Sequence, residues 1–529
     1  MKSLAVLTAG WRRLERHAAA APFLAFFLGA LTTCAFAPLG LFWLTPLTLA
    51  FLFRLLVAAP GGWHALLRAW LFGMGVFLAG VSWVFNSIHI FGGLSVPLAA
   101  VPTFLLCFIL ASGHLFFGIF RYHLPASPWR QALFFAAIYA AIDLGRGWLF
   151  TGFPWLALGF SQTPPSPFSG YAPIFGVYGL SFFVAFCAAL LTLGSRVQPR
   201  FWFVALAILV IGAGLRQIQW THPVGAPISV TLIQSNIGQD QKWQPENYPE
   251  TLRFYRQQIE ANPAQLTVLP ETALPVFYDT LPPAYLNLLE TLARREAGDL
   301  LLGVPLRSKT QFWNGAVSRG VSPSQRYAKS HLVPFGEYVP EGFRWFMGLV
   351  NIPMVGFTPG SLRQPPLAIA GQQIAVNICY EDLFGQGLLP PLPRATMMVN
   401  LSNTAWFGQR SLAQDQHLQI ARMRALETGR PMLRATNTGM TAVIRPDGQV
   451  QSVLPPFTHG VLTGRVAGYQ GMTPYIFWGD IPIAFFLLAL MLWLQWREVA
   501  QGSRSAGNQH PEQPAHGQQR FPCSAVLPP

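Results

Sequence analysis

Charged residues are scarce in this chain. Of its 529 residues, 11% are Asp, Glu, Lys or Arg, whereas 52% are hydrophobic, and the mean hydropathy is +0.36. An ordinary soluble domain is about 25% charged. The scarcity excludes a wholly soluble protein. It indicates a membrane protein whose soluble part has to be located along the chain.

Cysteine is also scarce. Of the five cysteines, Cys34, Cys107 and Cys187 lie in long apolar runs, where cysteine serves as a small packing residue. Cys523 lies in a polar tail, so Cys379 stands alone in the large segment that contains most of the polar residues. The sequence therefore indicates no disulfide framework.

Acidic residues are outnumbered by basic ones, 21 against 35, which gives a net charge of +14. Such an excess can indicate nucleic-acid binding. However, no segment combines a dense basic run with aromatic residues, and many arginines lie between apolar stretches, as topology signals do. We expect no nucleic-acid partner. A phosphate-binding glycine loop and closely spaced Cys or His pairs are missing too, so we expect neither a metal nor an organic cofactor.

Long stretches without charge predict eight transmembrane spans. A span needs about 20 residues, so the uncharged stretches 17–53 and 69–120 hold two spans each, divided near Pro38–Gly40 and Asn86–Gly93. The other four are expected at 131–150, 173–194, 201–215 and 475–496.

Lys and Arg concentrate in alternate connections between these spans. These basic residues lie at the N-terminus, in the second-to-third, fourth-to-fifth and sixth-to-seventh connections, and on the C-terminal side. The first-to-second and third-to-fourth connections have none, and the fifth-to-sixth has only Arg146. Because basic residues mark the cytoplasmic side, the pattern predicts that both ends are cytoplasmic and that residues 216–472 lie outside the cytoplasm.

The outer segment is long enough for a complete domain. Strand-like runs such as "ISVTLIQSNI", "LTVLPE", "DLLLGVPL", "IAVNIC" and "TMMVNLS" alternate there with helix-like runs such as "NYPETLRFYRQQIEA". This alternation predicts an α/β domain. The predicted division is a cytoplasmic leader at 1–19, seven transmembrane helices at 20–219, the outer domain at 220–472, an eighth helix at 473–497 and a disordered cytoplasmic tail at 498–529.

Three strand-like runs of the outer domain are followed by polar groups. Glu271 follows one run, Lys329 another, with Glu337 eight residues later, and Cys379 ends a third. Taken singly, these are a capping or solvated carboxylate, a surface ammonium and a packed thiol. Ligand sites of α/β sheets form at the carboxyl ends of strands, so the three groups can converge.

Together the three groups suit nucleophilic catalysis. A thiol has a reference pKa of about 8.5 and needs activation. A helix N-terminus after Cys379 and a nearby ammonium would favour the thiolate, and a carboxylate base could take the thiol proton. A lysine can stabilise the oxyanion of a tetrahedral intermediate.

The strings around these residues carry a resemblance. "LPET", "YAKSHLVPFGEYVP" and "NICYED" resemble the segments that hold the Glu-Lys-Cys triad of the nitrilase superfamily. Together with the eight predicted spans, five longer strings are similar to those of bacterial apolipoprotein N-acyltransferases. They are "HLVPFGEYVP", "CYEDLF", "VNLSNTAWFG", "RGWLFTGFPWLALGFSQ" and "RMRALETGRPMLRATNTGMTAVI". The resemblance covers the chain from about residue 20 to residue 496.

The resemblance implies a nitrilase-type αββα sandwich inserted in an eight-helix transmembrane bundle, on the periplasmic face of the bacterial inner membrane. Cys379 would attack an acyl ester of a phospholipid, typically phosphatidylethanolamine, and form a thioester. The N-terminal amine of an S-diacylglyceryl-cysteine apolipoprotein would then take the acyl chain, in the last step of lipoprotein maturation. Glu271 would be the base and Lys329 the oxyanion stabiliser.

Further residues match motif positions that bind substrate or support the site in that family. They are Glu337, Tyr380, Glu381, Trp243 and Trp406. Trp243, in "GQDQKWQPE", matches a tryptophan on a mobile loop. One position departs from the pattern, because Thr404 stands where "SNDAWFG" would have an aspartate.

Two other functions use the same sequence features. A membrane-tethered amidase or hydrolase of the nitrilase type would accept water instead of an amine, although one anchor would then suffice. A transporter or receptor with a binding domain predicts ionisable groups within its spans. The predicted spans have few, chiefly Asp143, Arg146 and Asp480.

Overall fold

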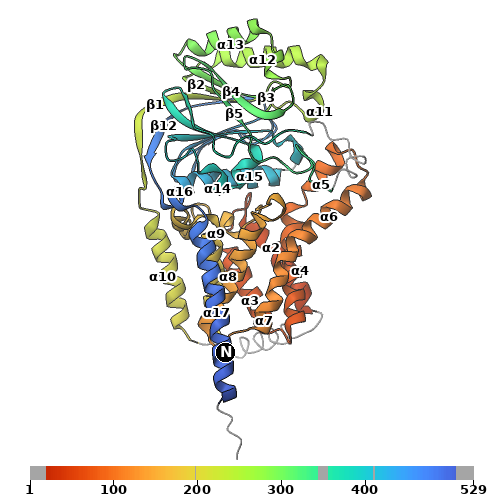
Figure 1. Cartoon of the computed structure of the whole chain (residues 1–529), viewed down its shortest axis with the longest axis vertical. Coiled ribbons are helices and arrows are strands. Elements are labelled where there is room, and N and C mark those ends of the chain that lie inside the picture. Colours follow the sequence, from red (N-terminus) through yellow and green to blue (C-terminus); the bar gives the residue numbers. More distant parts are fainter. Residues whose placement is uncertain (1–19, 197, 343–355, 409–410, 508–529) are drawn as a thin grey trace, which may run out of the picture.

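The apolar runs of the first 215 residues form a helical bundle, and the residues that follow form two sheets stacked on it (Figure 1). This computed structural model describes residues 20–196, 198–342, 356–408 and 411–507. The bundle helices are α2 (Ala20–Thr32), α3 (Leu44–Val57), α4 (Gly62–Val81), α5 (Val84–Asn86), α6 (Val96–Ser112), α7 (Phe117–Tyr122), α8 (Pro128–Arg146), α9 (Ala172–Arg196), α10 (Arg200–Leu215) and α17 (Ile481–Gly507).

The bundle has the composition of a membrane domain. Among the described residues, three helical stretches are long and apolar enough to cross a membrane, namely Gly62–Val81, Val96–Tyr122 and Pro167–Gly194. Shorter apolar helices lie at Ala20–Ala35, Leu44–Val57, Arg200–Leu215 and Ile481–Leu494. The predicted segments are therefore helical, and the predicted eight-helix membrane bundle remains a prediction.

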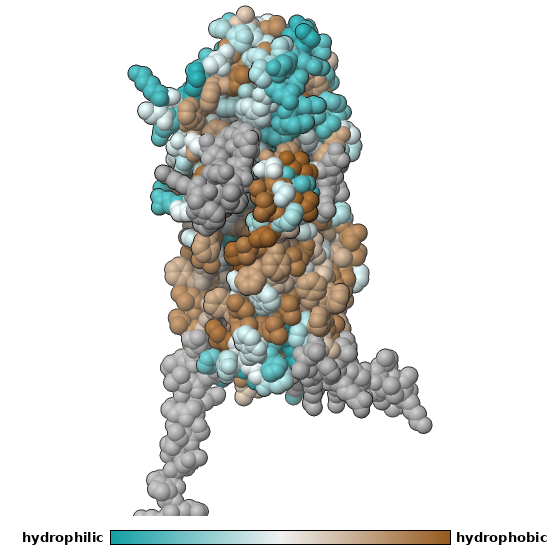
Figure 2. All heavy atoms as spheres, turned by 90° about the vertical axis from the view of Figure 1, so that its right-hand side faces the viewer, coloured by the Kyte–Doolittle hydropathy of each residue, from teal (hydrophilic) through white to brown (hydrophobic). Residues whose placement is uncertain are grey.

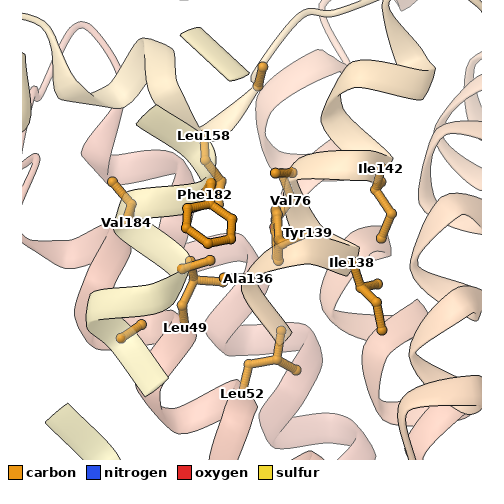
Figure 3. Packing of buried hydrophobic residues seen from close by; sticks show 14 of the residues in the cluster. Leu49, Leu52, Val76, Ala136, Ile138, Tyr139, Ile142, Leu158, Phe182 and Val184 are labelled. Carbon is orange, nitrogen blue, oxygen red and sulfur yellow. The ribbon is translucent and has the colours of Figure 1, made fainter. Parts of the chain in front are cut away.

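Apolar side chains fill the interior of the bundle and also cover its outside. Leu49 and Leu52 of α3 belong to the same buried hydrophobic cluster as Ala136 of α8 and Phe182 of α9 (Figure 3). On the outside, Phe23, Phe203 and Phe485 are 68%, 71% and 68% exposed. Figure 2 shows hydrophobic residues gathered over the helical half and hydrophilic ones over the far end of the sheet half. A surface of this kind suits lipid.

The sheet domain is defined here as residues 221–471, and its described residues form two six-stranded sheets. The first has the order β12-β1-β2-β3-β4-β5 and the second the order β11-β10-β9-β8-β7-β6. The strands of the first sheet are β1 (Thr221–Gln234), β2 (Leu266–Val268), β3 (Asp299–Arg307), β4 (Phe312–Gly320), β5 (Arg326–Ala328) and β12 (Gly460–Gly471). Those of the second are β6 (Leu367–Ile369), β7 (Gln372–Ile378), β8 (Met397–Ser402), β9 (Met432–Thr436), β10 (Ala442–Ile444) and β11 (Val450–Val453).

Helices cover the outer face of each sheet, which gives four layers. Helices α12 (Tyr248–Ala261) and α13 (Pro283–Arg294) bury leucines such as Leu289 against Leu302 of β3. Helix α15 (Ser411–Thr428) lies on the second sheet, where Ala421 contacts the cluster that holds Met398 and Met432. A third cluster lies between the sheets. The predicted αββα sandwich is confirmed.

Helix α15 also separates the second sheet from the bundle, together with α14 (Gly385–Leu388) and α16 (Pro474–Trp478) (Figure 1). Side chains of α15 bind the bundle directly. The Nε1 of Trp155 donates to Gln416 at 2.7 Å, and the carboxylate of Glu427 accepts from the backbone N–H of Val177 at 2.8 Å. Helix α15 therefore joins the second sheet to the bundle.

The ends of the chain differ in part from the prediction. Helix α17 continues to Gly507, ten residues beyond the predicted end at 497. Its extension begins within "REVAQ", which consists mostly of good helix formers. Disorder was thus wrongly predicted for 498–507. The predicted leader at 1–19 and the remaining tail at 508–529 lie outside the described residues.

Candidate active site

Parallel strands bring the predicted site residues to one edge of the sandwich. In the first sheet β2 pairs in parallel with both β1 and β3, and in the second sheet β8 pairs in parallel with both β7 and β9. Glu271 follows β2, Lys329 follows β5 directly and Cys379 follows β7 directly. The carboxyl ends of such strands share one edge, which explains why residues fifty or more positions apart in the sequence meet there.

Cys379 lies on a strained turn. Its φ is +53°, a region that residues with a side chain rarely adopt. A 3-10 turn, Cys379–Leu383, follows it, where the sequence predicted the N-terminus of a helix. The short turn redirects the chain sharply at the end of β7 and leaves Cys379 partly exposed, whereas its neighbours on both sides are buried.

Glu271 is buried and held from three sides. Its Oε1 accepts from the side-chain amide of Asn314 at 2.6 Å, and its Oε2 accepts from the backbone N–H of Asn403 at 2.7 Å. The ammonium of Lys329 lies 3.5 Å from Oε1. A carboxylate with this many donors keeps one orientation.

Lys329 lies between two carboxylates. Its side chain is 1% exposed, and its Nζ is 2.9 Å from Glu337 and 3.5 Å from Glu271. Burial alone would lower the pKa of Lys329, but Glu337 and then Glu271 outweigh it, so the pKa is raised. The lysine is therefore a permanent cation. The amide of Asn314 joins the same group, because it also donates to Glu337 at 2.7 Å.

Burial raises the pKa of the Cys379 thiol, and the charge of Glu271 raises it further, while Lys329 acts in the opposite direction. The sequence had suggested a thiolate stabilised by a helix N-terminus and an ammonium. In the structure a 3-10 turn begins at Cys379 in place of the expected α-helix, and the carboxylates of Glu271 and Glu337 both accompany the ammonium. A raised pKa favours the neutral thiol, so a nucleophilic role for Cys379 requires a base.

Glu381 supports the turn that carries Cys379. Its carboxylate accepts from the backbone N–H of Ile378 at 2.7 Å, from the N–H and hydroxyl of Ser330 at 2.7 and 2.6 Å, and from the N–H of His331 at 3.2 Å. The hydroxyl of Tyr327 donates to it as well, at 2.9 Å. One buried carboxylate thus links the segment after Lys329 to the strand before Cys379.

Tyr380 reaches from this turn to the bundle. Its hydroxyl donates to the carbonyl of Gly152 at 2.7 Å. Gly152 follows the exposed apolar residues Trp148, Leu149 and Phe150 in the connection between α8 and α9. The hydroxyl therefore ties the position next to the thiol to a segment at the end of the bundle.

Trp243 lies beside the site on the segment after α11 (Gln239–Lys242). Its side chain lines an open cavity of about 400 Å³, together with Pro275, Val276, Phe277, Thr280, Pro305, Phe312, Gly356 and Phe357. The preceding residue, Lys242, is buried, and its ammonium donates to the backbone carbonyl of Glu271 at 3.1 Å and to Thr272 at 2.7 Å. Burial lowers the pKa of Lys242 to about 8.

Thr404 and Trp406 follow Asn403 in the segment after β8. The ring of Trp406 contacts Phe91, and its backbone carbonyl accepts from Ser87 at 2.6 Å, so this residue joins the sheet domain to the bundle. Thr404 is fully buried, and its hydroxyl has no hydrogen-bond partner within the described structure.

Sequence reasoning missed three groups of the site. Lys242, Asn314 and the backbone N–H of Asn403 all contact Glu271. A polar residue within the apolar run "FWNGAV" was the one available signal for Asn314. Among the described residues no cluster of His, Cys, Asp and Glu could hold a metal ion.

Comparison with known proteins identifies two families along the chain. The apolipoprotein N-acyltransferase N-terminal domain matches residues 28–190, and carbon-nitrogen hydrolase matches residues 229–471. Apolipoprotein N-acyltransferase of Nitrosomonas europaea is 46% identical over 88% of this chain and 95% of its own length. That of Chromobacterium violaceum is 44% identical over 89% of this chain and 93% of its own. At this identity over nearly the whole length, the chain belongs to the apolipoprotein N-acyltransferase family.

Proposed function

We propose that this protein transfers a fatty acyl chain from a phospholipid to the N-terminal amine of an S-diacylglyceryl-cysteine apolipoprotein, through a thioester on Cys379. Lipoprotein N-acylation is the activity of its family. The thioester, the roles of the site residues and a phosphatidylethanolamine donor are our proposals. The observation that carries them is the convergence of Glu271, Lys329 and Cys379 from three strand ends.

In the first half-reaction Glu271 takes the proton of the Cys379 thiol. The thiolate attacks the carbonyl carbon of the phospholipid ester, and the C–O bond breaks. The lysophospholipid oxygen leaves with the proton from Glu271. A base is required because the pKa of the thiol is raised, and the three donors on Glu271 keep its carboxylate in one orientation.

In the second half-reaction the acceptor's amine attacks the thioester. Glu271 takes a proton from the amine, the C–S bond breaks, and the thiolate is protonated again. In both steps negative charge develops on the carbonyl oxygen, and Lys329 stabilises it as a fixed cation. Glu337 holds that cation at 2.9 Å, so the ammonium needs no rearrangement when the charge appears. The proposed route uses two substrates in turn at one thiol, which is a ping-pong mechanism, and requires neither metal nor cofactor.

The bundle keeps both lipid substrates at the membrane. Extracting an acyl chain into water costs about 0.8 kcal/mol per CH₂. We propose that the chain crosses the bacterial inner membrane eight times, seven times within residues 20–219 and once at 473–497, with both of its ends in the cytoplasm. Residues 220–472 then lie in the periplasm. The alternation of basic connections and the apolar surface of the bundle support this arrangement.

Intact-mass spectrometry tests the covalent step. After exposure to phosphatidylethanolamine vesicles, the purified protein should gain the mass of one acyl chain, and neutral hydroxylamine should remove it. Cys379→Ser should show no gain. Cys34→Ser, at another partly buried thiol, should behave as the unaltered protein does. An adduct that survives in Cys379→Ser would refute the proposed nucleophile.

The same preparation separates the transferase from a membrane-tethered hydrolase. Adding a diacylglyceryl peptide with a free N-terminus should discharge the adduct and acylate the peptide. A hydrolase would instead release free fatty acid at the same rate with or without the peptide. We expect the adduct to persist without acceptor, because a transferase must keep water from its intermediate.

A further inference from the structure

Three buried side chains form a closed ring beneath the turn that carries Cys379. Asp382 belongs to the turn itself, His417 to α15 and Arg434 to β9, and each is at most 1% exposed. Nε2 of His417 lies 2.8 Å from Asp382, Nη1 of Arg434 lies 3.1 Å from Asp382, and Nη2 of Arg434 lies 2.8 Å from Nδ1 of His417. The catalytic route proposed above does not use this ring.

The ring has one possible arrangement of protons. A guanidinium can only donate hydrogen bonds, so Nδ1 of His417 must accept from Arg434. The proton of the neutral imidazole is then on Nε2, which donates to Asp382. Burial and the charge of Arg434 both lower the pKa of His417, in agreement with a neutral ring. Each of the three bonds therefore has a fixed direction.

The ring holds the strained turn at two points. Asp382 is one of them. The other is the backbone carbonyl of Cys379, which accepts from the amide of Asn400 at 3.3 Å, while Arg434 donates to the amide oxygen of the same Asn400 at 3.2 Å. A positive φ at a residue with a side chain persists only where its surroundings impose it. These contacts provide that constraint on Cys379.

His417 also faces the bundle. Its ring centre lies 5.7 Å from that of Trp155, and Phe407 contacts both rings, at 6.0 and 5.8 Å. Trp155 is 1% exposed and lies in the connection between α8 and α9. The imidazole thus contacts the support of the thiol on one side and a membrane-domain residue on the other.

We propose that His417 is a positioning residue for the acylation of Cys379. It acts through Asp382, to which its Nε2–H donates, and it fixes the direction of the thiol relative to the bundle through Trp155. The inference rests on the proposed function, since it assumes that Cys379 is the nucleophile. It assigns His417 no contact with substrate.

Two substitutions of similar size separate the two bonds of the imidazole. In His417→Gln the side-chain amide can take the position of Nε2 and still donate to Asp382. In His417→Asn the shorter amide can take the position of Nδ1 and accept from Arg434, but it leaves Asp382 without its donor. Thr231→Val serves as the control, because it changes a buried side chain and removes its partly buried hydrogen bond to the carbonyl of Asn262, on a strand outside this network.

The measurement is the single-turnover rate of adduct formation with phosphatidylethanolamine vesicles, at several lipid concentrations, together with the melting temperature of each variant. We expect His417→Asn to acylate about tenfold to a hundredfold more slowly than His417→Gln at saturating lipid. The half-saturating lipid concentration should be nearly equal in the two. Thr231→Val should acylate at the unaltered rate.

Other results would contradict the inference. Equal rates for His417→Gln and His417→Asn would overturn the positioning role, whether both are fast or both slow. So would a rate loss in Thr231→Val equal to that of His417→Asn at the same melting temperature, because stability alone would then explain it. If the unaltered protein forms no adduct, the proposed function itself fails, and that result is distinct from equal rates in the two variants.

Discussion

Replacing Glu381 by glutamine tests whether this residue supports the site or takes part in the reaction. The substitution keeps the shape of the side chain and removes its charge. In the structure the carboxylate accepts from three backbone N–H groups, those of Ile378, Ser330 and His331, and from the hydroxyls of Ser330 and Tyr327. The side chain of glutamine has one acceptor oxygen, so it cannot accept both from Ser330 and His331 on one side and from the backbone N–H of Ile378 on the other.

The magnitude follows from this count of donors. If the amide oxygen faces Ser330 and His331, the NH₂ group faces the backbone N–H of Ile378, which the carboxylate now accepts at 2.7 Å. One buried bond to a charged group is then lost and a backbone donor is left unpaired. We expect a loss of about 2 to 4 kcal/mol in the free energy of unfolding. For a domain of this size that lowers the melting temperature by about 5 to 15 °C.

The assay combines thermal unfolding in detergent with the rate of adduct formation. Glu296→Gln is the matched control, because Glu296 is exposed, and its substitution should change stability by less than about 0.5 kcal/mol. Because the lost bond lies directly before Cys379, acylation should slow together with the loss of stability. Slower acylation at an unchanged melting temperature would refute the supporting role and would mean that Glu381 touches substrate.

Three further predictions concern the charges and contacts around the site. Lys329→Met leaves the carboxylates of Glu271 and Glu337 without their cation and should destabilise the domain by about 3 to 5 kcal/mol. Adding Glu337→Gln to this variant should restore part of the lost stability. Equal unfolding midpoints for the single and the double variant would contradict this explanation. Tyr380→Phe removes the bond to Gly152, at 2.7 Å, and should lower stability by about 1 kcal/mol in denaturant unfolding. Burial lowers the pKa of Lys242 from 10.5 to about 8, so between those pH values the unfolded chain binds more protons than the folded one. The free energy of unfolding should therefore rise with pH across this range, by on the order of 3 kcal/mol. Lys242→Met should lack that rise in melting scans from pH 7 to 10.

Much of the sheet domain could be predicted from its sequence. Apolar runs such as "IAVNIC" have the length of buried strands, and their ends gave the places of Glu271, Lys329 and Cys379. The chain follows these signals because parallel strands buried on both faces are mostly apolar along their length. The polar residue after each run is therefore conspicuous.

The remaining parts of the site leave no such signal. Asn314 contacts Glu271 from within β4, and Asn403 does so through its backbone N–H, which any residue but proline would provide. Lys242 looks like a surface lysine in a polar loop, and its burial depends on how that loop folds back onto Thr272. These contacts are set by tertiary packing, which no local pattern records.

The two connections through which the chain enters and leaves the sheet domain have a consequence for how such a protein could arise. Strand β1 begins at Thr221, shortly after α10 ends at Leu215, and strand β12 ends at Gly471, shortly before α16 begins at Pro474. The two strands pair antiparallel from Thr221 opposite Gly471 onwards. Paired residues of this kind lie about 5 Å apart. Seen from the membrane, the whole sheet domain is thus one large loop whose two ends meet. Because its two ends lie side by side, a unit of this kind can be inserted into a connection between two helices without forcing those helices apart.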